Sequence, residues 1–224
     1  MTFSLGVLDP TTGAFGSVIA SSSPAVAARC VHLRDGTGVV HSQNVTDPRL
    51  GPRLLDRLAS GLSAEAALDE VLRTSSDTDF RQLTVVDRTG ATAVHSGSRS
   101  LGIVRSARSP YAVAAGNMLA TPSVPDAMLA GLADSSGSLE ERLLVGLAAG
   151  IAEGGEAGPI HSSGLSVVRD AGWRVTDLRI DWSDEPLEAL TALVGVWLPQ
   201  RDDYVIRGLD PARSPRYGVP GDDR

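Results

Sequence analysis

Short apolar runs in this chain come in pairs, and a few turn-forming residues separate the members of each pair. Residues 2–8 and 15–20 flank Asp9-Pro10 and Gly13, and residues 80–86 and 91–95 flank a second turn, Asp87-Arg88-Thr89-Gly90. A third pair covers residues 163–169 and 173–180. Short runs around such turns are typical of β-hairpins. The pairing therefore predicts antiparallel sheets rather than the parallel sheet that strict β-α-β alternation produces.

Helical segments lie between these hairpins. Apolar residues from Leu54 to Leu72 recur at spacings of three and four, and the break before Ser63 predicts two short helices, with Ser63 capping the second. Residues 123–134, 139–152 and 186–197 also read as helices, and Ser138 with Glu141 forms a capping-box pattern. Single strands are expected at 38–45 and 110–115.

This order of elements predicts the α+β class. Two antiparallel sheets packed face to face, with helices outside both, would bury every apolar face. We expect one domain over residues 1–198, and a tail over 199–224 that is rich in Arg, Asp, Pro and Gly and has little to bury.

Charge and composition exclude several classes of function. The net charge is −7 and the chain contains no lysine, which argues against nucleic-acid binding and removes any lysine Schiff base or lysine general base. Cys30 is the only cysteine, so no internal disulfide can form, and a reducing cytoplasm is the natural location. No signal peptide or membrane span is seen, so we expect no membrane association.

Thr2 is the first candidate for chemistry. Methionine is normally removed before a small residue, and Thr2 would then carry a free α-amine beside its hydroxyl. An α-amine has a pKa near 7.7–8.0, so it can take the hydroxyl proton without help from lysine or a histidine triad. A Met-Thr start is common, however, and an ordinary terminus is the alternative.

Gly116 and Asn117, at the expected end of strand 110–115, are the candidates for holding a developing oxyanion. A close-approaching backbone and a side-chain amide suit that role. The alternative is a turn in left-handed geometry.

Five segments give the chain a resemblance to a known family. They are TFSLGVLDPTTGAFGSVIAS, VVHSQNVTDPRLGPRLLDRLASGLSAEAAL, RQLTVVDRTGATAVHSG, AAGNMLA and LRIDWSDEPLEAL, in that order. Together they resemble the DUF1028 family, which is similar to N-terminal-nucleophile (Ntn) amidohydrolases. The resemblance implies a four-layer αββα sandwich of two antiparallel sheets.

The resemblance also implies roles for individual residues. Thr2 matches the family's proposed nucleophile, and its other matches are Ser42-Gln43, Arg81-Gln82, His95-Ser96-Gly97 and Gly116-Asn117. Two departures remove an arginine that many members carry. They are Ala20-Ser21-Ser22 and the stretch from Gly154 to Pro159. We therefore expect the substrate specificity to differ from that of the family members that carry these arginines.

The remaining candidates each have a structural alternative. We expect substrate-binding roles for five residues: Ser21, Gln43, Asn44, Arg81 and His95. Gln43 and Asn44 would otherwise satisfy a turn, and His95 would otherwise be a hydrogen-bonded core histidine.

Other reactive side chains have weaker support. His41 is expected to face solvent, and His161 is a candidate lid residue. Cys30 is the rival nucleophile, although a small buried hydrophobic role is its default. The four scattered histidines make a metal site improbable, and no cofactor is expected.

These observations favour an Ntn-type hydrolase that cleaves a small amide or ureide through Thr2. A non-catalytic protein that uses the same scaffold for ligand binding or assembly is the alternative, because a fold does not establish a function. An edge-rich, acidic β sandwich is also able to form a homodimer, and we keep that as an open expectation.

Overall fold

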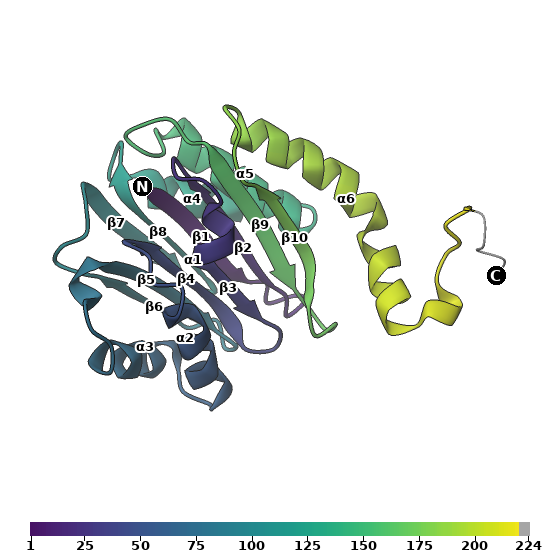
Figure 1. The fold of residues 1–224 in the computed structure, drawn as a ribbon, viewed down its shortest axis with the longest axis horizontal. Coiled ribbons are helices and arrows are strands. Elements are labelled where there is room, and N and C mark those ends of the chain that lie inside the picture. The colour runs from purple at the N-terminus through teal and green to yellow at the C-terminus, as the bar shows by residue number, and fades with distance from the viewer. Residues whose placement is uncertain (220–224) are drawn as a thin grey trace.

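The computed structural model describes residues 1–219 and contains two antiparallel sheets (Figure 1). The first is six-stranded, in the order β10-β9-β2-β1-β8-β7. Its strands are β1 (Thr2–Leu8), β2 (Phe15–Ser21), β7 (Ile103–Ser109), β8 (Ala112–Leu119), β9 (Ser162–Val168) and β10 (Arg174–Ile180). The second is four-stranded, in the order β3-β4-β5-β6. It comprises β3 (Val31–Arg34), β4 (Gly38–Asn44), β5 (Arg81–Asp87) and β6 (Thr92–Ser96).

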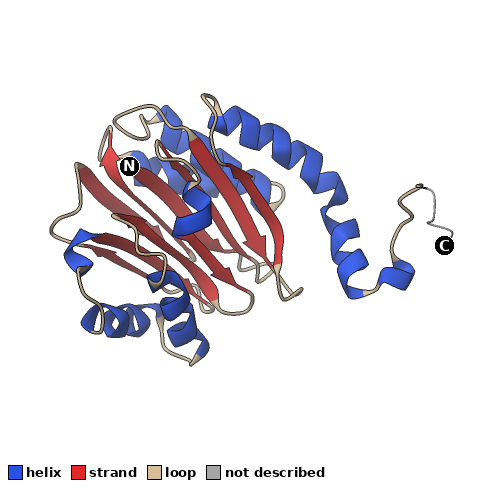
Figure 2. Cartoon of the chain, in the orientation of Figure 1, coloured by secondary structure: helices blue, strands red, loops and turns tan. Residues whose placement is uncertain are grey.

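Helices cover the outer faces of both sheets (Figure 2). The second sheet packs against α2 (Leu50–Ala59) and α3 (Ala64–Arg73), and the first against α4 (Val124–Ala133), α5 (Leu139–Ala152) and α6 (Pro186–Leu209). A short helix α1 (Val26–Cys30) and two 3₁₀ turns (Thr78–Phe80, Pro211–Arg213) complete the described chain. The α+β prediction of two antiparallel sheets between helical layers is confirmed.

Strand β1 shows why the sheets stack in this way. Phe3, Leu5 and Val7 point to one face, where they join the apolar core beneath α4 and α5. Thr2, Ser4 and Gly6 alternate with them and face the second sheet. A side chain at Gly6 would place its Cβ 3.2 Å from the His41 ring, so the two sheets approach closely at this point.

The space between the sheets is partly polar. His41 is fully buried there, with Nε2 2.7 Å from Ser17 Oγ and Nδ1 2.8 Å from Thr84 Oγ1. The expectation that His41 faces solvent was wrong. Val40 points to the opposite face of β4 and enters the core beneath α2 and α3. The expected alternation of Val40 and His41 is present, but both faces of this strand are buried. Burial lowers the pKa of His41 to about 3.

Most predicted elements are confirmed, including β1, α5, the Ser63 cap and the Ser138–Glu141 capping box. Four segments differ. The chain forms α1 and β3 over residues 26–34, and β7 over 103–109, where no element was predicted. Strand β8 continues to Leu119, so Gly116 and Asn117 lie inside the strand and not at a turn after it.

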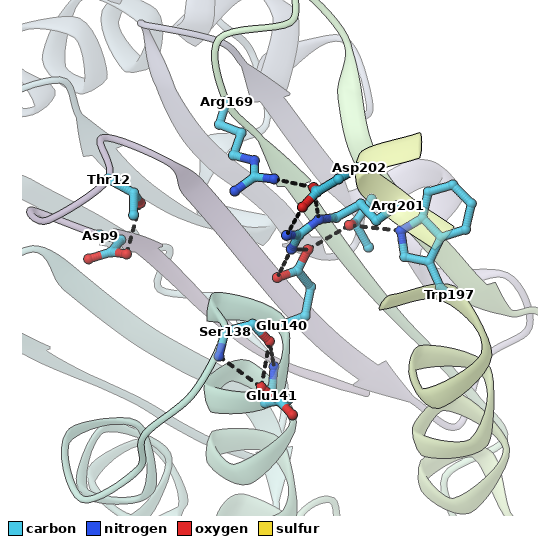
Figure 3. Close-up of polar contacts among 10 residues, drawn as sticks. Asp9, Thr12, Ser138, Glu140, Glu141, Arg169, Trp197, Arg201 and Asp202 are labelled. Atoms are coloured by element: carbon cyan, nitrogen blue, oxygen red, sulfur yellow. Dashed lines mark hydrogen bonds and ion pairs between the residues drawn. The ribbon is translucent and has the colours of Figure 1, made fainter. Parts of the chain in front are cut away.

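The largest difference is in α6, which continues through Pro199 to Leu209 and bends along its length (Figure 1). A proline removes one helical hydrogen bond and favours such a bend. Contacts beyond the proline hold this half in place (Figure 3). Arg201 Nη1 donates to both carboxylate oxygens of the buried Glu140, at 2.9 and 3.0 Å. Thr176 also donates to Glu140, and Trp197 donates to Thr176.

Candidate active site at one end of the central strands

The candidate site is a row of polar residues across four neighbouring strands of the first sheet. Thr2 lies directly opposite Asn117 in the β1–β8 pair, and Ser21 lies opposite Ser162 in the β2–β9 pair. Thr2 Oγ1 is 3.4 Å from Ser21 Oγ. All four residues are buried. The start of β1 thus places a hydroxyl in the middle of the sheet, between two ordered polar neighbours.

The Ser21 hydroxyl is oriented by its own loop. Its oxygen accepts the main-chain N–H of Ser23 at 3.0 Å, which leaves the hydroxyl proton available to donate. Both the Ser21 and the Thr2 hydroxyls donate to the main-chain carbonyl of Met1. A carbonyl oxygen therefore lies between these two hydroxyl groups.

Glu156 brings a carboxylate to the same place. It is 4% exposed, and a bridge to Leu119 at the end of β8 holds its backbone. Its two oxygens accept the Ser22 main-chain N–H at 3.0 and 3.1 Å. Burial raises the pKa of Glu156 to about 7, against the opposing effects of the N-terminal amine, the Ser22 hydrogen bonds and His161.

A chain of buried amides connects the row to the second sheet. Ser4 donates to Gln43 Oε1 at 2.8 Å, and Gln43 Nε2 donates to Gln82 Oε1 at 2.8 Å. Asn117 Nδ2 donates to the same Gln82 oxygen at 3.1 Å. Gln43, Gln82 and Asn117 are all fully buried. Gln43 is thus part of the framework beneath Thr2.

Three of the predicted substrate-binding residues are not brought to this row. Arg81 flanks Gln82 in β5, so its side chain points to the other face of the second sheet, where it donates to the Val45 carbonyl. His95 lies opposite Leu83 on that outer face and contacts the Thr78 carbonyl at 2.9 Å. Asn44 braces a loop, because it donates to the Phe80 carbonyl and accepts from Leu101 N–H.

Gly116 precedes Asn117 in β8, and its main-chain groups already have partners. It pairs with Phe3 in the β1–β8 ladder, and its carbonyl accepts Gln82 Nε2 at 3.0 Å. A Cβ at this position would come within 2.5 Å of Leu119 and 3.0 Å of Phe3. The absence of a side chain therefore serves close packing on the helix-covered face.

Gln82 and Glu156 were not among the predicted site residues, and Gln82 was named only within the Arg81-Gln82 match to the family. Gln82 lies in β5 next to the apolar Leu83, and a polar side chain at that position was the available signal. For Glu156 the sequence offered no signal beyond its position in a glycine-rich stretch. Its partner Ser22 is 134 residues away in the sequence, so local patterns do not reveal the contact.

His161 and Cys30 occupy different surroundings. The main-chain N–H of His161 donates to the Ser21 carbonyl at 2.9 Å, and the His161 ring stacks on Trp182 with 4.3 Å between centroids, so His161 lies at the rim of the row. Cys30 is buried, which raises the pKa of its thiol and opposes a role as nucleophile. Among residues 1–219 no cluster of histidine, cysteine and acidic side chains is close enough to hold a metal, and no helix has the length and apolarity needed to cross a membrane.

Comparison with known proteins identifies the family. A model described as "Family of unknown function (DUF1028)" matches residues 2–190. The chain belongs to DUF1028. A crystal structure of the DUF1028 protein SPO2555 from Silicibacter pomeroyi is 30% identical, with a TM-score of 0.84 over 91% of this chain and 93% of that one. The family resemblance drawn from the motifs is therefore confirmed.

More distant structures also align with this DUF1028 chain. Anbu (ancestral beta-subunit) from Yersinia bercovieri is 12% identical, with a TM-score of 0.40 over 88% of this chain and 97% of that one. Anbu from Hyphomicrobium sp. strain MC1 is 13% identical, with a TM-score of 0.40 over 92% and 98% of the two chains. A search of curated proteins finds no match.

Proposed function

We propose that this protein hydrolyses a small amide or ureide through Thr2, after Met1 has been removed. The observation that carries the proposal is the place of Thr2 Oγ1, at the buried start of a central strand and 3.4 Å from Ser21 Oγ. A nucleophile needs a rigid support of this kind. Removal of Met1 would add an amine to the same residue, which supplies the base.

In this mechanism the α-amine takes the proton of Thr2 Oγ1 while the oxygen bonds to the substrate carbonyl carbon. The resulting oxyanion needs a donor, and we assign that role to the Ser21 hydroxyl, which already donates to the Met1 carbonyl. The amine then returns the proton to the leaving nitrogen as the C–N bond breaks. Water attacks the acyl ester, loses a proton to the amine, and releases the carboxylic product and Thr2.

Asn117 was expected to hold the oxyanion together with Gly116. Asn117 Nδ2 donates to Gln82, and the main chain of Gly116 is paired with Phe3 in the β1–β8 ladder, so both groups are engaged in the framework. Ser21 is therefore the preferred donor in the proposal. We place the reaction in the cytoplasm, since the one cysteine is a buried free thiol.

The test begins with mass spectrometry of the purified protein, which reports whether Met1 is absent. A panel of amides and ureides is then screened for released ammonia or amine. We expect Thr2→Ala to abolish release and Thr2→Ser to keep part of it, while Cys30→Ala behaves as wild type. Full activity in Thr2→Ala, or retention of Met1 in active protein, would contradict the proposal.

A ligand-binding role without catalysis is the second candidate, and one pocket favours it. This pocket, of about 660 Å³, lies between the end of α5 and the start of α6. Apolar side chains, among them Ile151, Ile160 and Leu187, line it together with the acidic residues Asp184, Glu185 and Glu188. Such a lining suits a ligand with an apolar body and a cationic group. Under this alternative, ligand-induced thermal stabilisation is the same in Thr2→Ala and in wild type.

A further inference from the structure

Asn117 carries a buried acceptor that nothing in the described chain satisfies. Its Oδ1 has no hydrogen-bond partner among residues 1–219, and the residue is fully buried. An unsatisfied buried polar atom destabilises the folded state, so such atoms are rare and mark places where a partner is missing.

The direction of this acceptor is fixed by main-chain carbonyls. Gln82 Nε2 donates to the Gly116 carbonyl at 3.0 Å, and since a carbonyl cannot donate, the amide nitrogen of Gln82 must face it. Gln82 Oε1 then faces Gln43 and Asn117, and both must present their nitrogens to it. The Ala115 carbonyl fixes Gln43 in the same way, at 3.2 Å. Asn117 Oδ1 is thereby turned away from Gln82.

Removal of Met1 would create a donor for Asn117 Oδ1 at Thr2, the residue opposite. Thr2 and Asn117 are paired in the β1–β8 ladder, on adjacent strands and the same face. While Met1 is attached, Thr2 nitrogen is a peptide group with a single hydrogen. Once Met1 is removed it becomes an amine with two hydrogens, or three when protonated, and gains donors beside Asn117.

We propose that Asn117 Oδ1 accepts a hydrogen bond from the α-amine of Thr2, and that Gln82 is a positioning residue that holds Asn117 in this orientation. The inference rests on the proposed function in one respect, the removal of Met1. With one N–H held by Asn117, the lone pair of the neutral amine is directed to another side, where Thr2 Oγ1 lies. Two other titratable groups interact electrostatically with the N-terminal amine: Glu156, from the loop after α5, and the buried Cys30 thiol. His161 in turn acts on Glu156.

The absence of lysine makes the proposal directly measurable. The α-amine is the only primary amine in the chain, so any amine-specific reagent reports on it alone. The full chain can be produced with Thr2 as its first residue by cleaving an N-terminal fusion partner, whether or not cells remove Met1. The rate of acetylation by acetic anhydride, followed against pH by mass spectrometry, then gives the pKa of this amine.

A hydrogen bond to the protonated amine raises its pKa. We therefore expect Asn117→Ala to lower the pKa of the α-amine by roughly one, and Gln82→Met to lower it in the same direction although Asn117 is still present. Asn117→Asp keeps an acceptor and adds a negative charge, so it should raise the pKa above that of wild type. Ser166→Ala, on the same inner face in β9, is the matched control and should leave the amine pKa unchanged.

An unchanged amine pKa in folded Asn117→Ala overturns the inference, and so does a pKa in Asn117→Asp at or below that of wild type. Amide hydrolysis measured on the same preparations separates the two proposals. Shifted amine pKa values without hydrolysis uphold the hydrogen bond and contradict the hydrolase. Hydrolysis with no shift in the amine pKa upholds the hydrolase and contradicts the hydrogen bond.

Discussion

Both carboxylate oxygens of Glu156 accept the main-chain N–H of Ser22, at 3.0 and 3.1 Å. This contact ties the loop after α5 to the residue that follows β2, and it places a buried acid beside the N-terminus. The ionisation of Glu156 is therefore linked to the stability of the site.

The ionisation of Glu156 should lower the stability of the wild-type protein as the pH rises from about 4.5 to 7. Burial raises the pKa of Glu156 from 4.5 to about 7, so the folded state binds the proton more tightly than the unfolded state. The stabilising contribution is complete below pH 4.5 and is lost by pH 7, a change of roughly 3 kcal/mol. Urea denaturation against pH should show this slope in wild type and lose it in Glu156→Gln. The exposed Glu153→Gln serves as control, and an unchanged slope in Glu156→Gln would refute the prediction.

His41 should act in the opposite direction. Its pKa is lowered to about 3, so the folded state disfavours the proton that the unfolded chain binds near pH 6.5. The stability that neutral His41 provides is present above pH 6.5 and falls away as the pH drops toward 3. We expect His41→Gln to be less stable than wild type at pH 7 and to show a flatter decline in acid. A steeper decline in this variant would contradict the assignment.

Removing only one partner of the Glu140–Arg201 ion pair should destabilise the protein strongly. Glu140 is 1% exposed, so Arg201→Ala leaves a buried charge without its partner. A loss of about 3–5 kcal/mol in the free energy of unfolding is expected. The double variant Glu140→Gln with Arg201→Met should be more stable than Arg201→Ala alone. Equal losses in both would mean that packing, and not the unpaired carboxylate, causes the effect.

Gly116 should not accept a side chain without loss. A methyl group there meets Phe3 Cβ at 3.0 Å and Leu119 Cδ2 at 2.5 Å, on the packed face of the sheet. We expect Gly116→Ala to lower the free energy of unfolding by about 1–3 kcal/mol, as overpacking usually does. Calorimetry provides the measurement. An unchanged melting temperature would show that Leu119 can move aside.

Local patterns predicted the fold well where the chain carries clear turn or capping residues. The β1–β2 hairpin and α5 carry strong turn or capping signals, and both appear as predicted. Strand β7 was missed because an exposed edge strand has no apolar alternation to reveal it. The second half of α6 was missed because Pro199 is a normal stop signal, and the contact of Arg201 with Glu140 on another helix overrides it.

The site was predictable only in part, for a similar reason. Thr2 and Asn117 were chosen as candidates from local chemistry and resemblance, and the β1–β8 register places them opposite each other. Arg81 and His95 were chosen by residue type, but strand alternation directs them to the outer face. Gln82 and Glu156 owe their importance to partners that are distant in sequence, and such pairings come only from the assembled sheets.

Strand β1 is bonded along both edges, to β2 and to β8, from its first residues onward. The beginning of the chain cannot open alone, because two ladders must part together. The amide protons of residues 3–8 should therefore exchange with solvent only through opening of the whole sheet, on the slowest timescale of the protein. In most domains the terminus is the first segment to open, whereas here it is among the last.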